Sequence, residues 1–460
     1  MKKTYRTLLI YVIPILVLCS CDQYLDVAPK GKRLLETVKD YDSWLNNGDV
    51  ETSTPMQLNY LSDFTDKPTI PTTLTSSNDM IYTWQSQFSE TVPGSAILWS
   101  NYYSSIYLFN AVIANVLSAK DGTDQEKLSL RAEGLLGRAY EYLGLVNLYG
   151  KQYDSETAST DLAVPFVTSI DVTDPVPGRS TVQEIYDHII ADINEAIPDL
   201  PEDNSQNRFR GSLAAGYAVL ARTYLYMGNF SKAAENAQLA LNNGPDKILD
   251  YTTITDAKGI PHLMKRSDAI YARLGGISYL GKDLPTVEFL KTFNKKDLRL
   301  TFFYNNLGDY SFPTRGKVNF VHAGVPSGYA YPNWGLSVAE MHLIIAEAEA
   351  RANHLPEAIN HLDIIRKCRF KAADYTKFVS DNQEEVLQKV LSERTYELSF
   401  CGLRWFDMRR LNAEGRMPEI RRYDGLGNVV ASLTPGSNKY ILQIPIQVLY
   451  FNPDWEQNPE

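Results

Sequence analysis

Four side chains within seven residues could together bind a sugar. Asn78, Asp79, Tyr82 and Trp84 follow a stretch rich in Thr and Ser. A pyranose has C–H patches on its faces and hydroxyl groups around its rim, so an aromatic ring can stack on it while amides and carboxylates bond the hydroxyls. We therefore expect Trp84 to stack and Asn78 and Asp79 to bond hydroxyls. The alternative is that Tyr82 and Trp84 are core residues of a short strand.

Two further tyrosines, Tyr279 and Tyr304, lie in or beside a second loop-rich segment. Because long loops often carry function, both are also candidates for contact with the same ligand. They are weaker candidates than the first four residues. Trp99 and Tyr103 instead share one face of an expected helix, and we interpret them as packing residues.

Nothing in the sequence has the spacing of a catalytic or metal centre. The six histidines form no His-Glu-x-x-His pattern, and no Gly-x-Ser-x-Gly motif occurs. The segment 276–282 approaches a phosphate-binding loop, but Asp283 replaces the Ser or Thr that would hold magnesium. A pair of glycosidase carboxylates cannot be recognised among 55 acidic residues. We expect a protein that is not an enzyme and has no metal or cofactor.

A charged cluster near the C-terminus could be mistaken for an active site. It comprises Glu393, Arg394, Glu397, Arg404, Asp407, Arg409 and Arg410. Opposite charges three and four residues apart are typical of ion-pair networks on a helix. We therefore interpret the cluster as structural, with Trp405 and Phe406 pinning its helix against the preceding repeat.

The first twenty residues predict a lipoprotein signal peptide. A basic start is followed by an apolar run and by small residues before Cys21. The segment Leu18-Cys19-Ser20-Cys21 resembles a lipobox, after which Cys21 would become the first residue and carry acyl chains such as palmitate. The alternative is an ordinary signal peptide with a chance cysteine. Cys368 and Cys401 then remain, either as one bridge or as two buried thiols.

Composition excludes several classes of protein. The 460 residues include 45 Lys and Arg against 55 Asp and Glu, which gives a net charge of −10. A nucleic-acid binder usually has a basic face, so this balance disfavours that class. Hydrophobic residues make up 44% of the chain, which is enough for a large core and argues against disorder.

Apolar residues recur at three- and four-residue spacing after residue 95, which predicts a mainly α fold. We expect helices at about 97–118, 126–148, 181–197, 212–227, 230–242, 336–352, 355–370 and 382–401. They would form one lobe over 21–460, with helix groups at about 97–148, 181–242 and 336–401 and loop-rich ligand regions at about 48–95 and 243–335. Little β structure is expected.

The helices repeat with a period of about 34 residues, which is typical of tetratricopeptide-like helix pairs. One copy spans 214–247, where Ala221 and Ala233 allow close approach and Gly228 makes the turn. A second spans 339–370, with Asn353 in place of the turn glycine. A third is split by an insertion at 150–180. Stacked pairs of this kind share a continuous core.

The order of several short motifs resembles the SusD/RagB family of Bacteroidetes outer-membrane lipoproteins. They are Cys21-Asp22-Gln23-Tyr24-Leu25-Asp26, Arg138-Ala139-Tyr140, Leu148-Tyr149-Gly150, Val164-Pro165, Arg179-Ser180-Thr181-Val182, Glu393-Arg394-Thr395-Tyr396-Glu397-Leu398, Gly402-Leu403-Arg404-Trp405-Phe406-Asp407-Met408-Arg409-Arg410, Ile444-Pro445-Ile446 and Asn452-Pro453. The resemblance covers nearly the whole chain. One departure is Ser337, which stands where the family usually has an arginine, so any ion pair of that arginine is absent.

The resemblance implies a cell-surface binding protein of the outer membrane, lipid-anchored and facing the exterior. Such proteins resemble a lid on a SusC-type TonB-dependent transporter, to which they deliver an oligosaccharide or polysaccharide or, in some members, peptides. The tetratricopeptide-like helices are expected to face the transporter and the loops to hold the ligand. Alternatives are peptide capture, a scaffold without ligand, or a lipid-anchored glycan hydrolase.

Overall fold

The computed structural model describes residues 35–460 except 53, 68–69, 90, 256–258, 276–283, 306–309, 313–315, 319–320, 323–331 and 425. The predicted signal peptide, Cys21 and Tyr279 lie outside the described residues.

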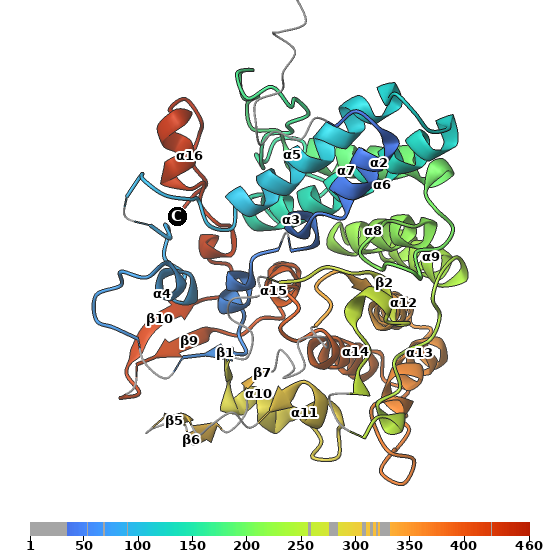
Figure 1. The fold of residues 1–460 in the computed structure, drawn as a ribbon. Helices are drawn as coiled ribbons and strands as arrows, with labels where there is room; N and C mark the ends of the chain where they lie inside the picture. Colours follow the sequence, from blue (N-terminus) through green and yellow to red (C-terminus); the bar gives the residue numbers. More distant parts are fainter. Residues whose placement is uncertain are drawn as a thin grey trace, which may run out of the picture.

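Long helices lie stacked side by side along one side of the molecule (Figure 1). They are α5 (Ser100–Asn115), α6 (Asp124–Tyr149), α7 (Val182–Ala196), α8 (Leu213–Tyr226), α9 (Phe230–Asn242), α12 (Val338–Arg351), α13 (Leu355–Lys367) and α14 (Gln383–Glu397). Consecutive helices pack as the pairs α6–α7, α8–α9 and α12–α13, and α9 also packs on α12. This arrangement confirms the predicted mainly α, tetratricopeptide-like fold.

The turns within two of these pairs use a left-handed residue, as the repeat pattern predicts. Gly228 between α8 and α9 has φ +72°, and Asn353 between α12 and α13 has φ +64°. Asparagine tolerates this conformation better than most residues with a side chain. The α12–α13 pair therefore turns in the same way as the α8–α9 pair, although it has no glycine at the turn. Its α12 is capped by Ser337, whose Oγ accepts a hydrogen bond from the Glu340 N–H.

Short elements lie in the loop-rich regions and toward both ends of the described chain. They are α2 (Val38–Leu45), α3 (Gly48–Glu51), the 3-10 helix η2 (Met56–Leu61), α4 (Ser77–Tyr82), α10 (Val287–Thr292), α11 (Arg299–Phe302), α15 (Arg404–Ala413) and α16 (Ile446–Phe451). Among the described residues, two-stranded antiparallel sheets join β1 (Thr65–Asp66) to β3 (Leu284–Pro285), β2 (Ala269–Tyr271) to β8 (Leu336–Ser337), β4 (Tyr304–Asn305) to β7 (Val321–His322), β5 (Tyr310–Phe312) to β6 (Gly316–Val318), and β9 (Ile420–Tyr423) to β10 (Val429–Leu433). The alternative that Tyr82 and Trp84 are core residues is confirmed, but they do not lie in a strand, since α4 ends at Tyr82 and Trp84 lies in the turn after it.

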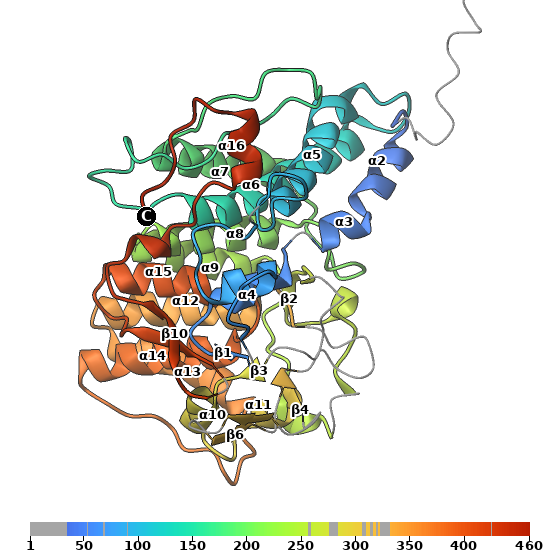
Figure 2. The ribbon, with the colours of Figure 1, turned by 90° about the vertical axis from the view of Figure 1, so that its left-hand side faces the viewer.

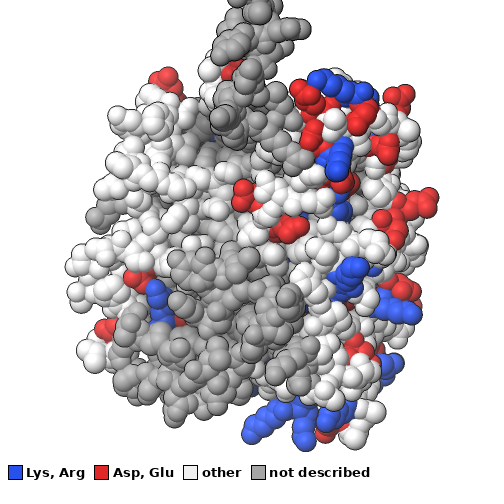
Figure 3. Space-filling model, viewed as in Figure 1, with Lys and Arg blue, Asp and Glu red and all other residues white. Residues whose placement is uncertain are grey.

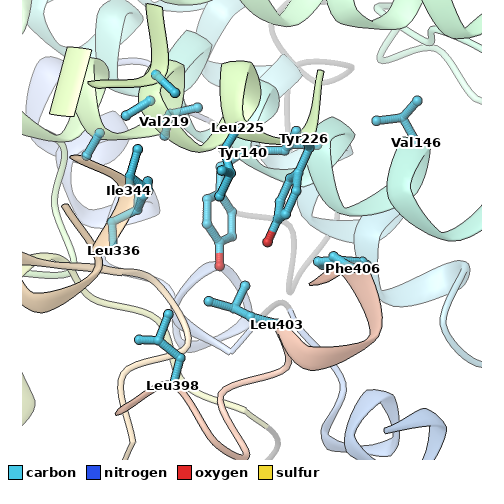
Figure 4. Packing of buried hydrophobic residues seen from close by; sticks show 14 of the residues in the cluster. Tyr140, Val146, Val219, Leu225, Tyr226, Leu336, Ile344, Leu398, Leu403 and Phe406 are labelled. Atoms are coloured by element: carbon cyan, nitrogen blue, oxygen red, sulfur yellow. The ribbon is translucent and has the colours of Figure 1, made fainter. Parts of the chain in front are cut away.

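The core joins helices that are distant in the sequence (Figure 4). Tyr226 of α8 and Phe406 of α15 meet edge to face, with ring centroids 5.9 Å apart. Trp405 stacks on Tyr440 at 5.5 Å. Phe406 therefore packs α15 against α8, which belongs to the repeat at 214–247 and not to the preceding repeat at 339–370, and Trp405 contacts the C-terminal segment.

The insertion at 150–180 is fixed to α5 by hydrogen bonds. The Tyr103 hydroxyl donates to the carbonyl of Pro165 at 2.8 Å, and Asn110 Nδ2 donates to the carbonyl of Val167 at 2.8 Å. Figure 2 shows this segment and α16 at the same end of the molecule as α2. Within the described part of the chain, no helix combines the length and hydropathy needed to cross a membrane.

Candidate functional site

The two aromatic residues predicted to contact a sugar lie beneath the surface. Tyr82 is 1% exposed and Trp84 is 3% exposed. The Tyr82 hydroxyl donates to Asp66 Oδ1 at 3.0 Å, and Trp84 Nε1 donates to the carbonyl of Leu61 at 3.1 Å. Both polar atoms are therefore used inside the fold, as buried aromatic residues require.

An arginine from the C-terminal hairpin lies against both rings. The guanidinium carbon of Arg422 is 4.1 Å from the ring centroid of Tyr82 and 4.2 Å from that of Trp84. Its nitrogens donate to the carbonyls of Tyr60, Ser62, Thr65 and Tyr82 at 2.7–3.0 Å. A sugar could stack on Trp84 only by displacing this arginine. We therefore interpret the two rings as the support of the candidate site rather than its contact surface.

Polar groups around α4 are closer to solvent. Asn78 is half-buried, and its side chain has no hydrogen-bond partner among the described residues. Asp79 is 8% exposed and forms an ion pair with Lys67, whose Nζ lies 5.6 Å from the ring centroid of Tyr60. Of the predicted contacts, Asn78 alone combines a surface position with an unused amide. Sequence reasoning missed Lys67, although a buried Asp79 needs a nearby cation.

Tyr304 lies in a separate aromatic core under the same loop-rich side. It is 2% exposed, and its hydroxyl is 2.9 Å from Ser399 Oγ. The surrounding buried rings are Phe64, Phe289, Phe293 and Phe400. Burial raises the pKa of the Tyr304 hydroxyl, so the group stays neutral. Tyr304 thus supports the fold beneath the predicted ligand region and has no open ring face.

A groove that the sequence did not predict lies where the turns of two helix pairs meet. We call it the helix-turn groove. It encloses about 980 Å³, and a neighbouring hollow of about 520 Å³ shares four of its lining residues. The shared residues are Tyr153, Gly228, Phe230 and Arg351. No single motif marks this groove, because its two sides come from different repeats.

Charges inside the helix-turn groove are partly paired. The Arg351 guanidinium lies 4.2 Å from the ring centroid of Phe230 and bonds Glu347 at 2.9 Å and Glu414 at 2.8 Å. His354 Nδ1 lies 2.7 Å from Glu349 Oε2. Arg351 and His354 therefore each contact an acid of the same chain.

Two histidines form a hydrogen bond between the helices behind this groove. His342 of α12 and His361 of α13 have their Nδ1 atoms 2.8 Å apart. Burial and the neighbouring His361 lower the pKa of His342 to about 4, and burial also lowers the pKa of His361. At neutral pH both rings are therefore uncharged, with one Nδ1 donating to the other.

The histidine pair makes stability fall in mild acid. Since the folded-state pKa of His342 is below its unfolded value near 6.5, the unfolded chain binds the proton first. We expect the free energy of unfolding to fall by at most about 1.4 kcal/mol per pH unit from this group, as pH drops from about 6.5 to about 4. Urea denaturation across this range measures the slope. The variant His342→Asn keeps a hydrogen-bonding atom near Nδ1 but does not titrate, so it should show a shallower slope. An equal slope in the two proteins would contradict the assignment.

Six of the seven residues of the charged C-terminal cluster form ion pairs, and Arg409 instead donates to the carbonyls of Asn147 and Gly150. Arg394 bonds Asp407 at 2.9 Å, Arg369 bonds Glu397 at 2.5 Å, and Arg404 bonds Asp63 at 2.6 Å. Most partners come from other elements, which differs from the pairs along one helix that the spacing suggests. Every one of these contacts is internal, as the structural interpretation predicts.

The remaining reactive groups do not assemble into a centre. Among the described residues, no three His, Cys, Asp or Glu side chains come together as metal ligands would. Cys368 and Cys401 are free thiols, so the alternative of a disulfide bridge is wrong. Burial raises the pKa of the Cys401 thiol to about 12, which makes it a poor nucleophile.

Known proteins resemble this chain along both of its halves. A family model described as starch-binding and associating with the outer membrane matches residues 23–225, and the SusD family model matches 304–460. SusD-like protein P2 of Formosa agariphila is 26% identical over 68% of this chain and 71% of its own length. A SusD-like protein of Bacteroides ovatus is 22% identical over 87% of this chain and 81% of its own.

Solved structures show the same fold. A SusD superfamily protein from Bacteroides vulgatus aligns with a TM-score of 0.72 at 20% identity, covering 92% of this chain and 99% of its own. A SusD-like carbohydrate binding protein from the same species aligns with a TM-score of 0.70 at 17% identity, covering 92% and 98%. The two family models, which match opposite ends of the chain, show that it belongs to the SusD/RagB family.

Proposed function

We propose that this protein is a lipid-anchored lipoprotein of the outer membrane that captures a glycan at the cell surface and delivers it to a SusC-type TonB-dependent transporter. The observation that supports this most is membership of the SusD/RagB family, which two family models support from opposite ends of the chain. The lipobox at Cys21 supports the anchor. The protein would bind without turnover and without a cofactor.

We place the ligand on the loop-rich side, around α4 and the β9–β10 hairpin. Figure 3 shows few charged residues on this side, in the left part of the view, whereas charges gather over the helices on the right. A neutral glycan suits such a surface, because its hydroxyl groups bond amides as well as charged groups. Asn78 is the candidate contact, and Lys67, which pairs with the adjacent Asp79 and lies over the ring of Tyr60, is a second one. Asp79, Tyr82, Trp84 and Tyr304 would position these groups from below, and a contact by Tyr279 stays a prediction.

Affinity electrophoresis tests the proposal. The chain from Asp22 would be run in native gels that contain plant, host or microbial polysaccharides. We expect one glycan to retard it, and Asn78→Ala to weaken binding roughly 3- to 10-fold, as loss of one hydrogen bond does. Asn360→Ala, which changes an exposed asparagine of α13, is the matched control and should change nothing. Binding of mixed peptides with no glycan retarded would favour peptide capture instead, and release of sugar would show a hydrolase.

A further inference from the structure

We propose that the helix-turn groove binds an extended segment of a partner protein whose basic side chains flank an apolar residue. This goes beyond the glycan function, because the groove lies among α8, α9, α12 and α13 and not on the loop-rich side. Small-molecule pockets enclose roughly 300–1,000 Å³. The groove of about 980 Å³ continues into a hollow of about 520 Å³, which together suit a longer chain segment.

The floor of the groove is apolar. The half-buried Met227 and Phe230 lie at the start and end of the turn between α8 and α9, and the buried Ile345 lies on α12. Ala234 and Ala348 line the walls, so the space between α9 and α12 stays open. An apolar side chain of a partner could bury its surface here, with a gain of about 25 cal/mol for each Å² removed from water.

The uncompensated charge of the groove is negative. Glu235 of α9 and Glu357 of α13 are exposed, and neither has an ion-pair partner among the described residues. The cationic Arg351 is already bonded to Glu347 and Glu414. Two unpaired carboxylates on opposite sides of an apolar floor therefore select Lys or Arg side chains in the occupant.

A buried acceptor at the inner end supports a polypeptide. Gln152 lines the neighbouring hollow, and its Nε2 donates to the carbonyl of Tyr226 at 2.6 Å. Its Oε1 is buried without a hydrogen-bond partner in the described chain. A backbone N–H of an extended segment would satisfy this oxygen. A glycan is less suited to the groove, because the Arg351 guanidinium covers one face of the Phe230 ring.

Fluorescence anisotropy with the full chain in detergent tests the proposal. The probes are two labelled heptapeptides, Lys-Leu-Lys-Phe-Lys-Leu-Lys and the same peptide with every Lys replaced by Glu. We expect the basic peptide to bind and the acidic one not to. The double variant Glu235→Gln/Glu357→Gln should bind the basic peptide roughly tenfold more weakly, as loss of two exposed charge pairs implies. Phe230→Ser should weaken it as well.

The matched control is Glu202→Gln/Glu288→Gln, which removes two exposed acids outside the groove. Its affinity for the basic peptide should equal that of the unchanged protein, and both double variants should melt at the same temperature. Equal weakening by the two double variants, or no binding of the basic peptide, would overturn the proposal. So would loss of glycan retardation in Glu235→Gln/Glu357→Gln, which would make the groove a glycan site. Failure of glycan binding in every protein would instead count against the proposed function alone.

Discussion

Arg222→Met is expected to lower the free energy of unfolding by about 3–5 kcal/mol, because it leaves a buried carboxylate without its main partner. Arg222 of α8 bonds Glu340 of α12 through Nε at 2.8 Å and Nη2 at 2.5 Å. The two side chains are 4% and 1% exposed. The nearest other cation is Arg394, whose Nη2 is 3.5 Å from Glu340. Urea denaturation followed by circular dichroism measures the loss.

An exposed pair provides the control for this prediction. Arg416 bonds Glu384 at 2.6 Å, but the side chains are 25% and 58% exposed. Arg416→Met should cost less than about 1 kcal/mol, since water solvates the remaining carboxylate. The double variant Arg222→Met/Glu340→Met should recover much of the stability lost in Arg222→Met. If Arg222→Met lowers the free energy of unfolding no more than Arg416→Met does, the buried ion pair does not hold the α8–α9 pair and the α12–α13 pair together.

Trp84→Ala is expected to lower the free energy of unfolding by about 3–5 kcal/mol, the usual cost of deleting a buried aromatic ring. The ring is 3% exposed and packs under Arg422, and its Nε1 bonds the Leu61 carbonyl. The substitution removes the ring and leaves a cavity below η2 and α4. Urea denaturation at neutral pH measures the change, and hydrogen exchange should show earlier opening of the segment from Met56 to Tyr82.

Phe451→Ala is the matched control, because Phe451 is a large aromatic residue that is 77% exposed on α16. It should change the free energy of unfolding by about 0.5 kcal/mol or less.

The comparison also affects the glycan assay. Weaker retardation of Trp84→Ala would reflect unfolded protein unless affinity is measured for the folded fraction. A Trp84→Ala protein as stable as Phe451→Ala but unable to bind glycan would revive stacking on Trp84.

Helix positions could be predicted because their signals are local. Apolar residues at three- and four-residue spacing predict a helix at 230–242, and α9 spans Phe230–Asn242. The expected helix at 97–118 is shorter as α5, Ser100–Asn115, and continues as a 3-10 turn over Val116–Ser118. End positions were less certain, because capping and the last turn depend on single contacts.

Side-chain exposure in the candidate site could not be predicted in the same way. Trp84 follows polar residues, a pattern that suits a surface ring as well as a buried one. Trp84 is covered by Arg422, which lies 340 positions from Tyr82 in the sequence and donates a hydrogen bond to the Tyr82 carbonyl. Sequence periodicity describes which face of an element is apolar, but it does not say which distant residue covers that face.

The sequence by itself determined the helix repeats, the turn at Gly228 and Asn353, and the family to which the chain belongs, because each depends on residues close together in the chain. Only the tertiary structure decided that Tyr82 and Trp84 are buried and that a groove lies between two helix pairs. It also paired Glu340 with Arg222, 118 positions away. Such ion pairs form between residues distant in the sequence because the stacked helices bury charged side chains. A buried charge is costly unless an opposite charge lies beside it.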